Sequence, residues 1–487
     1  MKRILCYLIF GLVFASCDKY LEVKPTNQLV VSTYDDVKAL LAGHLKMYTT
    51  EMFTLTETNI PFLDRTSYKV FAYYCDDLDP DRYLNNYLGT NNKSLFYNSL
   101  DWQNATLPGI LWGNYYQNIG FYNMLEYELG KIEGVAQADR QIVLGEVKFL
   151  RAWSLFKLMQ YFSPYHNNQL GIPVNLNADA VGSYDARRRT QTEVYDIILS
   201  ELQEILDYPT APTSYNIFYD KKLIHALMAQ VYHFKGGSGA GADSDWDNAI
   251  THAEAAMEGR SLQGIDNFEP LEVEDEILGI FKDKQASLLV VNRGGNNPSY
   301  GDIVGEPGWG TYQHPTASLL NLYDSTDVRY DRFFTVTDWF GDKTEGVIGK
   351  FNKPDFKYGY YALNFFQISD LHLIITESYA RKGDNNAAKE KLEEFLRHRI
   401  PGYTSYTGND VLGAILDERR KEFCFEYDMR WCDLVRTQKG WTRKALDKEE
   451  GKFYKLEDND YRFCLPIPLN EELQYNKIDQ NPGWGAF

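Results

Sequence analysis

The chain has 487 residues, a formal net charge of −18 at pH 7 and an aromatic content of 15%. A chain of this length can bury a large hydrophobic core without disulfide staples and has room for roughly two to four domains. The acidic balance argues against nucleic acid as a partner, because proteins that bind nucleic acid carry basic patches. The one compact basic run, at 187–189, lies just before a predicted helix, and we interpret it as a solvated loop.

The first 17 residues have the three-part layout of a secretory signal. Lys2 and Arg3 are followed by an apolar run over 4–14, and two small residues then lead into Cys17. The run is well short of the roughly 20 residues that a membrane-spanning helix needs. We therefore predict a bacterial lipoprotein signal at 1–16, cleaved before Cys17, whose acylated thiol holds the mature chain on a membrane. The alternative is an ordinary signal peptide with a cysteine nearby.

The remaining cysteines predict no metal site. Beyond Cys6 and Cys17, the chain contains Cys75, Cys424, Cys432 and Cys464. They form no Cys-x-x-Cys motif and no Cys/His cluster at zinc spacing. A disulfide in an oxidising compartment and buried free thiols both remain open.

Helical periodicity begins near Ser32 or Thr33 and returns at 112–129, 139–162 and 190–208. Thr190 and Glu193 form a candidate capping box at the start of the last of these helices. Helical hairpins are expected within 139–208, 221–259 and 368–438. The pairs over 221–259 and 368–398 each have a short Gly-containing turn, which is typical of tetratricopeptide repeats. These repeats are not contiguous, so a plain solenoid is excluded.

Two segments lack clear periodicity and are rich in aromatic residues. Over 59–108 we expect loops and short turns, and over 261–345 a second irregular region with a short strand at 288–291. Long loops in a globular domain are usually functional or disordered, and aromatic content argues against disorder. We predict a mostly α fold, a single domain over 17–487, with ligand-loop regions at about 68–110 and 292–313.

Several motifs together resemble the SusD/RagB family of outer-membrane nutrient-binding lipoproteins. They are 145–153 (GEVKFLRAW), 171–174 (GIPV), 374–384 (IITESYARKGD), 416–436 (LDERRKEFCFEYDMRWCDLVR), 466–468 (PIP) and 480–484 (QNPGW). Thr376 and Ser378 replace alanines of the family pattern. The resemblance implies a SusD-like helical fold with tetratricopeptide-like hairpins and minor β structure. It also implies a lid-like position on a SusC-type TonB-dependent transporter at the cell surface, and capture of oligosaccharides or peptides without catalysis or a cofactor.

The motif at 416–436 is interpreted as scaffold, because its charged residues recur at helical spacings of three or four that allow ion pairs. These residues are Glu418, Arg419, Glu422, Glu426, Arg430, Asp433 and Arg436. Phe423, Phe425, Trp431 and Leu434 are expected to pack beneath them.

Ligand contacts are expected where aromatic rings stand beside polar side chains in the two loop regions. Rings stack on sugar faces, while polar groups pair with hydroxyls. The candidate ligand-binding residues are Asp77, Trp102, Asn104, Arg293, Tyr300, Trp309 and Tyr312. Packing in the core or in a loop is the alternative for each of them.

Other functions find less support. The acidic runs beginning at Asp77 and Asp243 lack the glycine that an EF-hand needs at its sixth position, and the second run is expected to cap a helix. Neither His-Glu-x-x-His nor Gly-x-Ser-x-Gly occurs. A surface glycoside hydrolase stays an alternative, since two carboxylates suffice for that chemistry. A purely structural surface protein is a third possibility. An oligosaccharide is the preferred cargo, with an oligopeptide as the alternative.

Overall fold

The computed structural model describes residues 31–49, 65–79, 106–178, 187–265, 287–293, 305–306, 311–312, 314–337, 342–350, 361–444, 453–468 and 477–485. The helices in the first half of these residues are α2 (Tyr34–Thr49), α3 (Arg65–Tyr74), α6 (Thr106–Lys131), α7 (Gln137–Phe162), α8 (Gln191–Leu206), α9 (Lys221–Gly236) and α10 (Asp243–Met257). Those in the second half are α12 (Ala317–Leu320), α13 (Val328–Phe334), α14 (Ile368–Arg381), α15 (Asn385–Arg397), α16 (Val411–Phe423), α17 (Met429–Thr437) and the 3₁₀ turn η4 (Tyr461–Phe463).

The strands in the described residues are short and pair two by two in antiparallel fashion: β1 (Leu78–Asp79) with β5 (His314–Pro315), β2 (Ser287–Arg293) with β8 (Tyr361–Gln367), β3 (Gly305–Glu306) with β4 (Thr311–Tyr312), β6 (Thr335–Thr337) with β7 (Lys343–Glu345), and β9 (Trp441–Lys444) with β10 (Phe453–Leu456). The strand predicted at 288–291 lies inside β2. The mostly helical fold with minor β structure is therefore confirmed.

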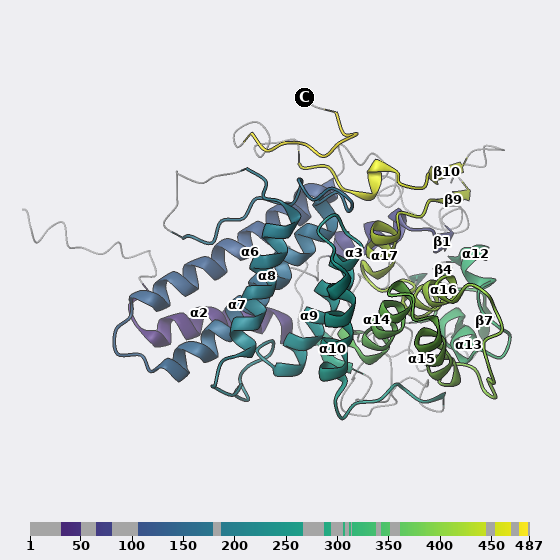
Figure 1. Cartoon of the computed structure of the whole chain (residues 1–487), viewed down its shortest axis with the longest axis horizontal. Coiled ribbons are helices and arrows are strands. Elements are labelled where there is room, and N and C mark those ends of the chain that lie inside the picture. The colour runs from purple at the N-terminus through teal and green to yellow at the C-terminus, as the bar shows by residue number, and fades with distance from the viewer. Residues whose placement is uncertain are drawn as a thin grey trace, which may run out of the picture.

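The helices form an elongated array (Figure 1). α2, α6, α7 and α8 occupy one end, α9 and α10 cross the middle, and α14 to α17 lie at the other end. α10 packs against both α9 and α14, and α14 also packs against α15 and α16. The two predicted tetratricopeptide-like hairpins, α9–α10 and α14–α15, thus stack on each other although more than 100 residues separate them in the chain.

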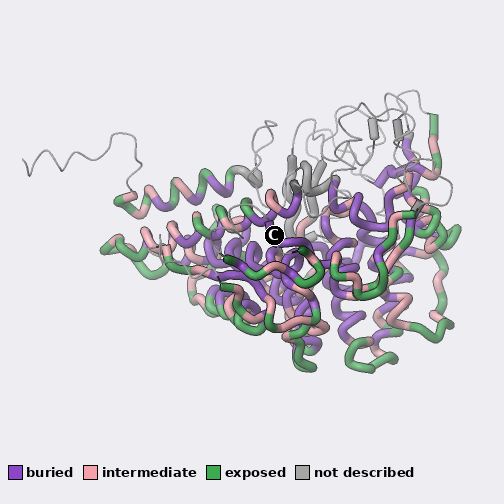
Figure 2. Tube along the Cα trace, turned by 90° about the horizontal axis from the view of Figure 1, so that it is seen from above, coloured by how far each residue is buried: buried purple, intermediate pink, exposed green. Residues whose placement is uncertain are grey.

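α7 packs between α6 and α8, and the family-like motif at 145–153 explains its packing. Arg151 is buried and donates to Glu201 Oε1 at 2.9 Å and Asn123 Oδ1 at 3.1 Å. The buried carboxylate of Glu146 accepts from Phe218 N at 2.9 Å, which ties α7 to the segment before α9. Figure 2 shows buried residues running through the interior of the array, with exposed residues on its outer turns.

The capping box predicted for α8 is confirmed, whereas the predicted cap at 243–245 lies inside the first turn of α10, which begins at Asp243 after Ala242. Thr190 and Glu193 form the capping box of α8. Asp245 accepts from Ala242 N at 2.8 Å and so satisfies a free amide at the start of α10. Among groups of three or more His, Cys, Asp or Glu in the described part of the chain, none could hold a metal ion.

Two sequence interpretations are wrong. α3 lies within 59–108, where only loops and turns were expected. Val70, Phe71, Tyr73 and Tyr74 are all buried, and apolar or aromatic residues at successive positions obscure the helical periodicity. The basic run at 187–189 is not simply solvated, because Arg188 donates to the carbonyls of Phe162, Leu170 and Gly171 at 2.8–3.0 Å. Arg188 therefore fixes the exit of α7, where those carbonyls need donors.

Cys75, Cys424, Cys432 and Cys464 are free thiols, and all four are buried. Burial raises their pKa values, to about 12 for Cys424 and Cys464. A raised pKa keeps each thiol protonated and unreactive. Of the two interpretations left open by the sequence, buried free thiols hold. No helix in the described residues combines the length and the apolar character needed to cross a membrane.

Gly145 offers a test of the packing at α7. A Cβ at this position would overlap the ring of Tyr219, which is fully buried, whereas a Cβ at Gly120 on α6 meets nothing within 4 Å. Overpacking of a core costs about 1–3 kcal/mol. We expect Gly145→Ala to lower the free energy of unfolding by that amount in a urea titration. Gly120→Ala, the control, should raise it by about 0.5–1 kcal/mol, the usual gain in a helix. Equal effects of the two substitutions would contradict this packing.

Candidate functional site

The two predicted ligand-loop regions meet at one place in the structure. Leu78 and Asp79 of β1 pair with Pro315 and His314 of β5. Thr316 extends the contact, since its amide donates to Asp77 O and its hydroxyl to Asp76 O, both at 2.7 Å. We call residues 76–79 and 314–318 the loop junction. Asp79, at the end of β1, and His314, at the start of β5, are therefore held side by side.

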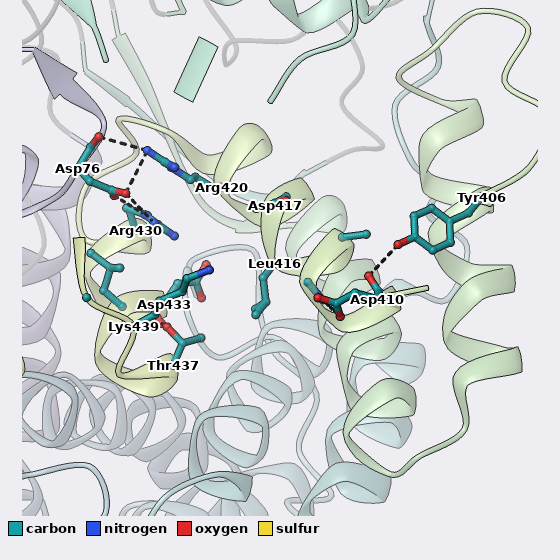
Figure 3. A pocket seen from close by; sticks show the side chains of 14 residues that line it. Asp76, Tyr406, Asp410, Leu416, Asp417, Arg420, Arg430, Asp433, Thr437 and Lys439 are labelled. Atoms are coloured by element: carbon teal, nitrogen blue, oxygen red, sulfur yellow. Dashed lines mark hydrogen bonds and ion pairs between the residues drawn. The ribbon is translucent and has the colours of Figure 1, made fainter. Parts of the chain in front are cut away.

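An arginine of α16 binds both halves of the loop junction. Arg420 donates from Nε to Asp77 Oδ1 at 2.7 Å and from Nη2 to Asp76 O at 3.2 Å. The same Nη2 lies 3.1 Å from Ser318 Oγ. Arg430 of α17 adds a two-pronged contact to the Asp76 carboxylate at 2.9 and 3.1 Å (Figure 3). A guanidinium suits this task because its donors form a rigid fork.

The electrostatics of the two junction carboxylates differ. Burial alone would raise the pKa of Asp76, but the guanidinium groups of Arg430 and Arg420 lower it to about 2. For Asp77, burial outweighs Arg420 and raises the pKa, and the neighbouring Asp76 charge adds to the rise. Asp77 is only 3% exposed, and its Oδ2 has no hydrogen-bond partner among the described residues. Asp76 is therefore a fixed negative charge, whereas the charged form of Asp77 is stabilised mainly by Arg420.

A second set of buried ion pairs holds the other face of α16. Arg329 is fully buried and lies 2.7 Å from Glu418 Oε2 and 3.0 Å from Glu422 Oε2. Arg399 binds Glu422 Oε1 at 2.6 Å. Burial would raise the pKa of Glu422, but Arg399 and Arg329 lower it to about 2. α16 is thus fixed on both sides by charge pairs.

α17 is tied into the same network. Asp433 of α17 binds Arg419 of α16 at 3.1 Å and Arg436 at 2.8 Å. Lys350 lies 2.6 Å from Glu426, between the two helices. Phe423, Phe425, Trp431 and Leu434 are buried. The ion pairs and the apolar packing predicted for 416–436 are confirmed.

A cleft of about 400 Å³ lies beside the loop junction, between α16 and α17. We call it the α16–α17 cleft. Asp76, Arg420 and Arg430 lie on one side of it, and Tyr406 and Asp410 lie on the opposite side (Figure 3). Its volume falls within the range of small-molecule sites, roughly 300–1,000 Å³.

The ligand-binding residues predicted from the sequence fall into three groups: one is buried, two lie at strand ends, and the others lie outside the described residues. Asp77 is buried in the loop junction. Arg293 ends β2 opposite Tyr361, and Tyr312 ends β4 opposite Gly305, but their side chains are outside the description. Trp102, Asn104, Tyr300, Trp309 and the lipidation residue Cys17 all lie outside the described residues.

The structure adds residues that the sequence reasoning passed over. Arg420 and Ser318 connect the two loop regions. Arg420 belongs to the motif at 416–436, but the spacing of charges along that helix predicted only ion pairs within the motif. Nothing in the local sequence connects it to residues more than 300 positions away.

Two family models match the chain. One is described as the SusD family and matches residues 335–484, and the other is described as starch-binding associating with outer membrane and matches 19–232. Together they cover about three quarters of the chain. No curated protein sequence shows a significant match.

Solved structures share the fold along nearly the whole chain. A sugar-binding protein, described as such provisionally, from Bacteroides vulgatus has a TM-score of 0.69 at 19% identity, covering 94% of this chain and 100% of its own. A SusD superfamily protein from Bacteroides thetaiotaomicron has a TM-score of 0.68 at 19% identity, covering 92% and 100%. A SusD-like carbohydrate binding protein from Bacteroides vulgatus has a TM-score of 0.65 at 16% identity, covering 92% and 97%.

The structure is thus a helical scaffold in which buried ion pairs hold α16 and α17 and in which β1 and β5 meet at one junction. The chain belongs to the SusD/RagB family, whose binding proteins are non-catalytic. The hydrolase alternative raised by the sequence is thereby set aside.

The contacts of Arg420 with Asp77, Asp76 and Ser318 can be tested by substitution of this arginine. Arg420→Ala leaves the buried Asp77 carboxylate without a positive partner, and loss of one partner of a buried pair costs about 3–5 kcal/mol. We expect a loss of that order in the free energy of unfolding, with partial recovery in Arg420→Lys. Arg397→Ala is the control, because its pair with Glu393 at 3.4 Å is exposed on the arginine side and worth about 0–1 kcal/mol. A loss no larger than that of the control would contradict these contacts.

Proposed function

We propose that this protein is a cell-surface lipoprotein that binds an oligosaccharide and delivers it to a SusC-type TonB-dependent transporter in the outer membrane. The observation that carries the proposal is the loop junction, where β1 pairs with β5 and Arg420 binds both halves. The descriptions of one family model and of two structural neighbours, which mention starch, sugar and carbohydrate binding, support this class of ligand.

The loop junction supports binding by one composite surface. Trp102 and Asn104 belong to the region after β1, and Tyr300, Trp309 and Tyr312 belong to the region before β5. Trp309 falls between β3 and β4, whose pairing brings Glu306 next to Thr311. A rigid base reduces the entropy lost when binding loops become ordered. Rings and amides from two regions can then contact successive sugar units of one ligand.

Asp77 has a different role in this proposal from the one expected for it. Its carboxylate is buried and bound to Arg420, so it positions the loop region rather than facing ligand. Arg293 and Tyr312 remain candidates for direct contact, since each lies at the end of a strand that leads out of or into the loop region.

The lipid anchor is part of the same proposal. Cys17 precedes the first described helix, α2, by 17 positions in the sequence. Acyl chains stabilise membrane attachment by about 0.8 kcal/mol per buried methylene. Mass spectrometry of the protein from membranes should find an acylated N-terminal Cys17. An unmodified, freely secreted chain would contradict the anchor.

Substitution of the two loop tryptophans tests the binding surface. Trp102→Ala and Trp309→Ala should each weaken oligosaccharide binding by one to a few kcal/mol, the scale of a binding hot spot, which is roughly fivefold or more in Kd. Isothermal titration with a panel of oligosaccharides and oligopeptides measures the effect and identifies the cargo class. Tyr215→Ala is the control, because Tyr215 is 89% exposed and lies outside both loop regions.

Three outcomes of this titration are decisive. Weakened binding in both tryptophan variants, with the control unchanged, supports the composite surface. Unchanged affinity in both variants would refute it. Binding of oligopeptides alone would replace the cargo class while keeping the delivery role.

A further inference from the structure

The α16–α17 cleft has a charge balance that suits a neutral ligand. The Asp76 carboxylate is paired with Arg420 and Arg430. Asp433 is paired with Arg419 and Arg436 from the protein interior. Charges that are already compensated in this way offer hydrogen bonds but little net attraction for an ion. These paired charges give the cleft little attraction for an ion, and Asp410 adds one carboxylate at the exposed edge, where it accepts from Gly413 N.

Two charged side chains of the cleft keep their hydrogen-bonding capacity. Among the described residues, neither Asp417 of α16 nor Lys439, just after α17, makes a hydrogen bond or an ion pair. Burial raises the pKa of Asp417, and the Lys439 charge opposes this rise. The two groups balance each other in charge, yet one supplies free acceptors and the other free donors. Such a pair is suited to hydroxyl groups, which both donate and accept.

The opposite side of the cleft adds an aromatic ring and fixed geometry. Tyr406 lies across the cleft from Asp76, with Leu416 and Asp417 between them (Figure 3). The Tyr406 hydroxyl donates to Asp410 O at 2.7 Å, and Asp410 Oδ1 accepts from Gly413 N at 2.8 Å at the start of α16. Ala414, Leu416 and Leu434 supply apolar atoms. A ring beside apolar atoms and free polar groups matches a sugar, whose ring faces carry C–H groups and whose edge carries hydroxyls.

We propose that the α16–α17 cleft is a second ligand site that binds one or two units of a neutral saccharide. The proposal rests on the proposed function only for the class of ligand, since every lining residue except Asp76 of the loop junction belongs to the scaffold at 406–440. Asp417 and Lys439 hold the hydroxyls, and Tyr406 packs against the sugar ring. A second site on the rigid scaffold would keep a long glycan attached while the loop surface engages another part of it, which raises the effective concentration of the chain.

The test uses the full mature chain with Trp102→Ala and Trp309→Ala introduced together, so that the loop surface does not contribute. Maltose, cellobiose and lactose are titrated and followed by saturation-transfer NMR. We expect binding of at least one of them, weakened fivefold or more by Asp417→Asn. Asp196→Asn, an exposed carboxylate on α8, is the control and should leave the Kd unchanged. Glucosamine and glucuronate should bind no better than the neutral sugars.

The outcomes separate this proposal from the one for the loops. No saccharide signal, or equal effects of Asp417→Asn and Asp196→Asn, would overturn the cleft as a sugar site. Preference for glucosamine or glucuronate would overturn the neutral ligand. If the tryptophan substitutions alone abolish all binding, the cleft proposal fails and the loop proposal stands. If only Asp417→Asn affects binding, the loop proposal fails and the cleft proposal stands. Melting temperatures of all variants exclude unfolding as the cause.

Discussion

The contact between Arg420 and the Asp76–Asp77 segment is the interaction on which the rest of the site depends. It joins α16 to a segment more than 340 residues earlier in the chain and, through Ser318, to a third segment. Taking such charges out of water costs several kcal/mol per ion, so the arrangement is favourable only if the donors and acceptors are satisfied. Arg430 adds two donors to the Asp76 carboxylate, and a separate set of buried pairs around Arg329 holds the other face of α16. The result is a single well-defined position for the roots of both loop regions.

This arrangement explains why the recognisable motifs lie away from the predicted ligand contacts. The residues at 416–436 form the base, and the base must be rigid for loops of different sequence to be presented in the same place. Gly145 and Arg151 serve the same purpose in α7, one by letting Tyr219 approach and the other by holding Glu201. Ligand specificity can then reside in the loops. The α16–α17 cleft would be an exception, because there the scaffold itself would contact the ligand.

Local sequence was sufficient to predict most of the helical scaffold. Apolar spacing predicted α7, α9, α10, α14 and α15, and capping chemistry placed the start of α8, while α10 begins three residues before the expected Trp246. It failed for α3, where apolar or aromatic residues at successive positions concealed the helical periodicity. It could not predict the loop junction, because two-residue strands carry no periodic signal and their pairing depends on contacts across more than 230 residues. The contact between Arg420 and Asp77 could not be predicted for the same reason, because it also joins residues far apart in the sequence.

Hydrogen–deuterium exchange of the mature protein, free and bound to its best oligosaccharide from the titration panel, tests the central claim most directly. If the loop junction presents one composite surface, exchange should slow in both 80–105 and 294–313 on binding. α16 and α17 should exchange slowly in both the free and the bound protein, because these helices form the rigid base and are ordered before the ligand binds. Slower exchange in one of the two regions alone, or in neither, would contradict the account.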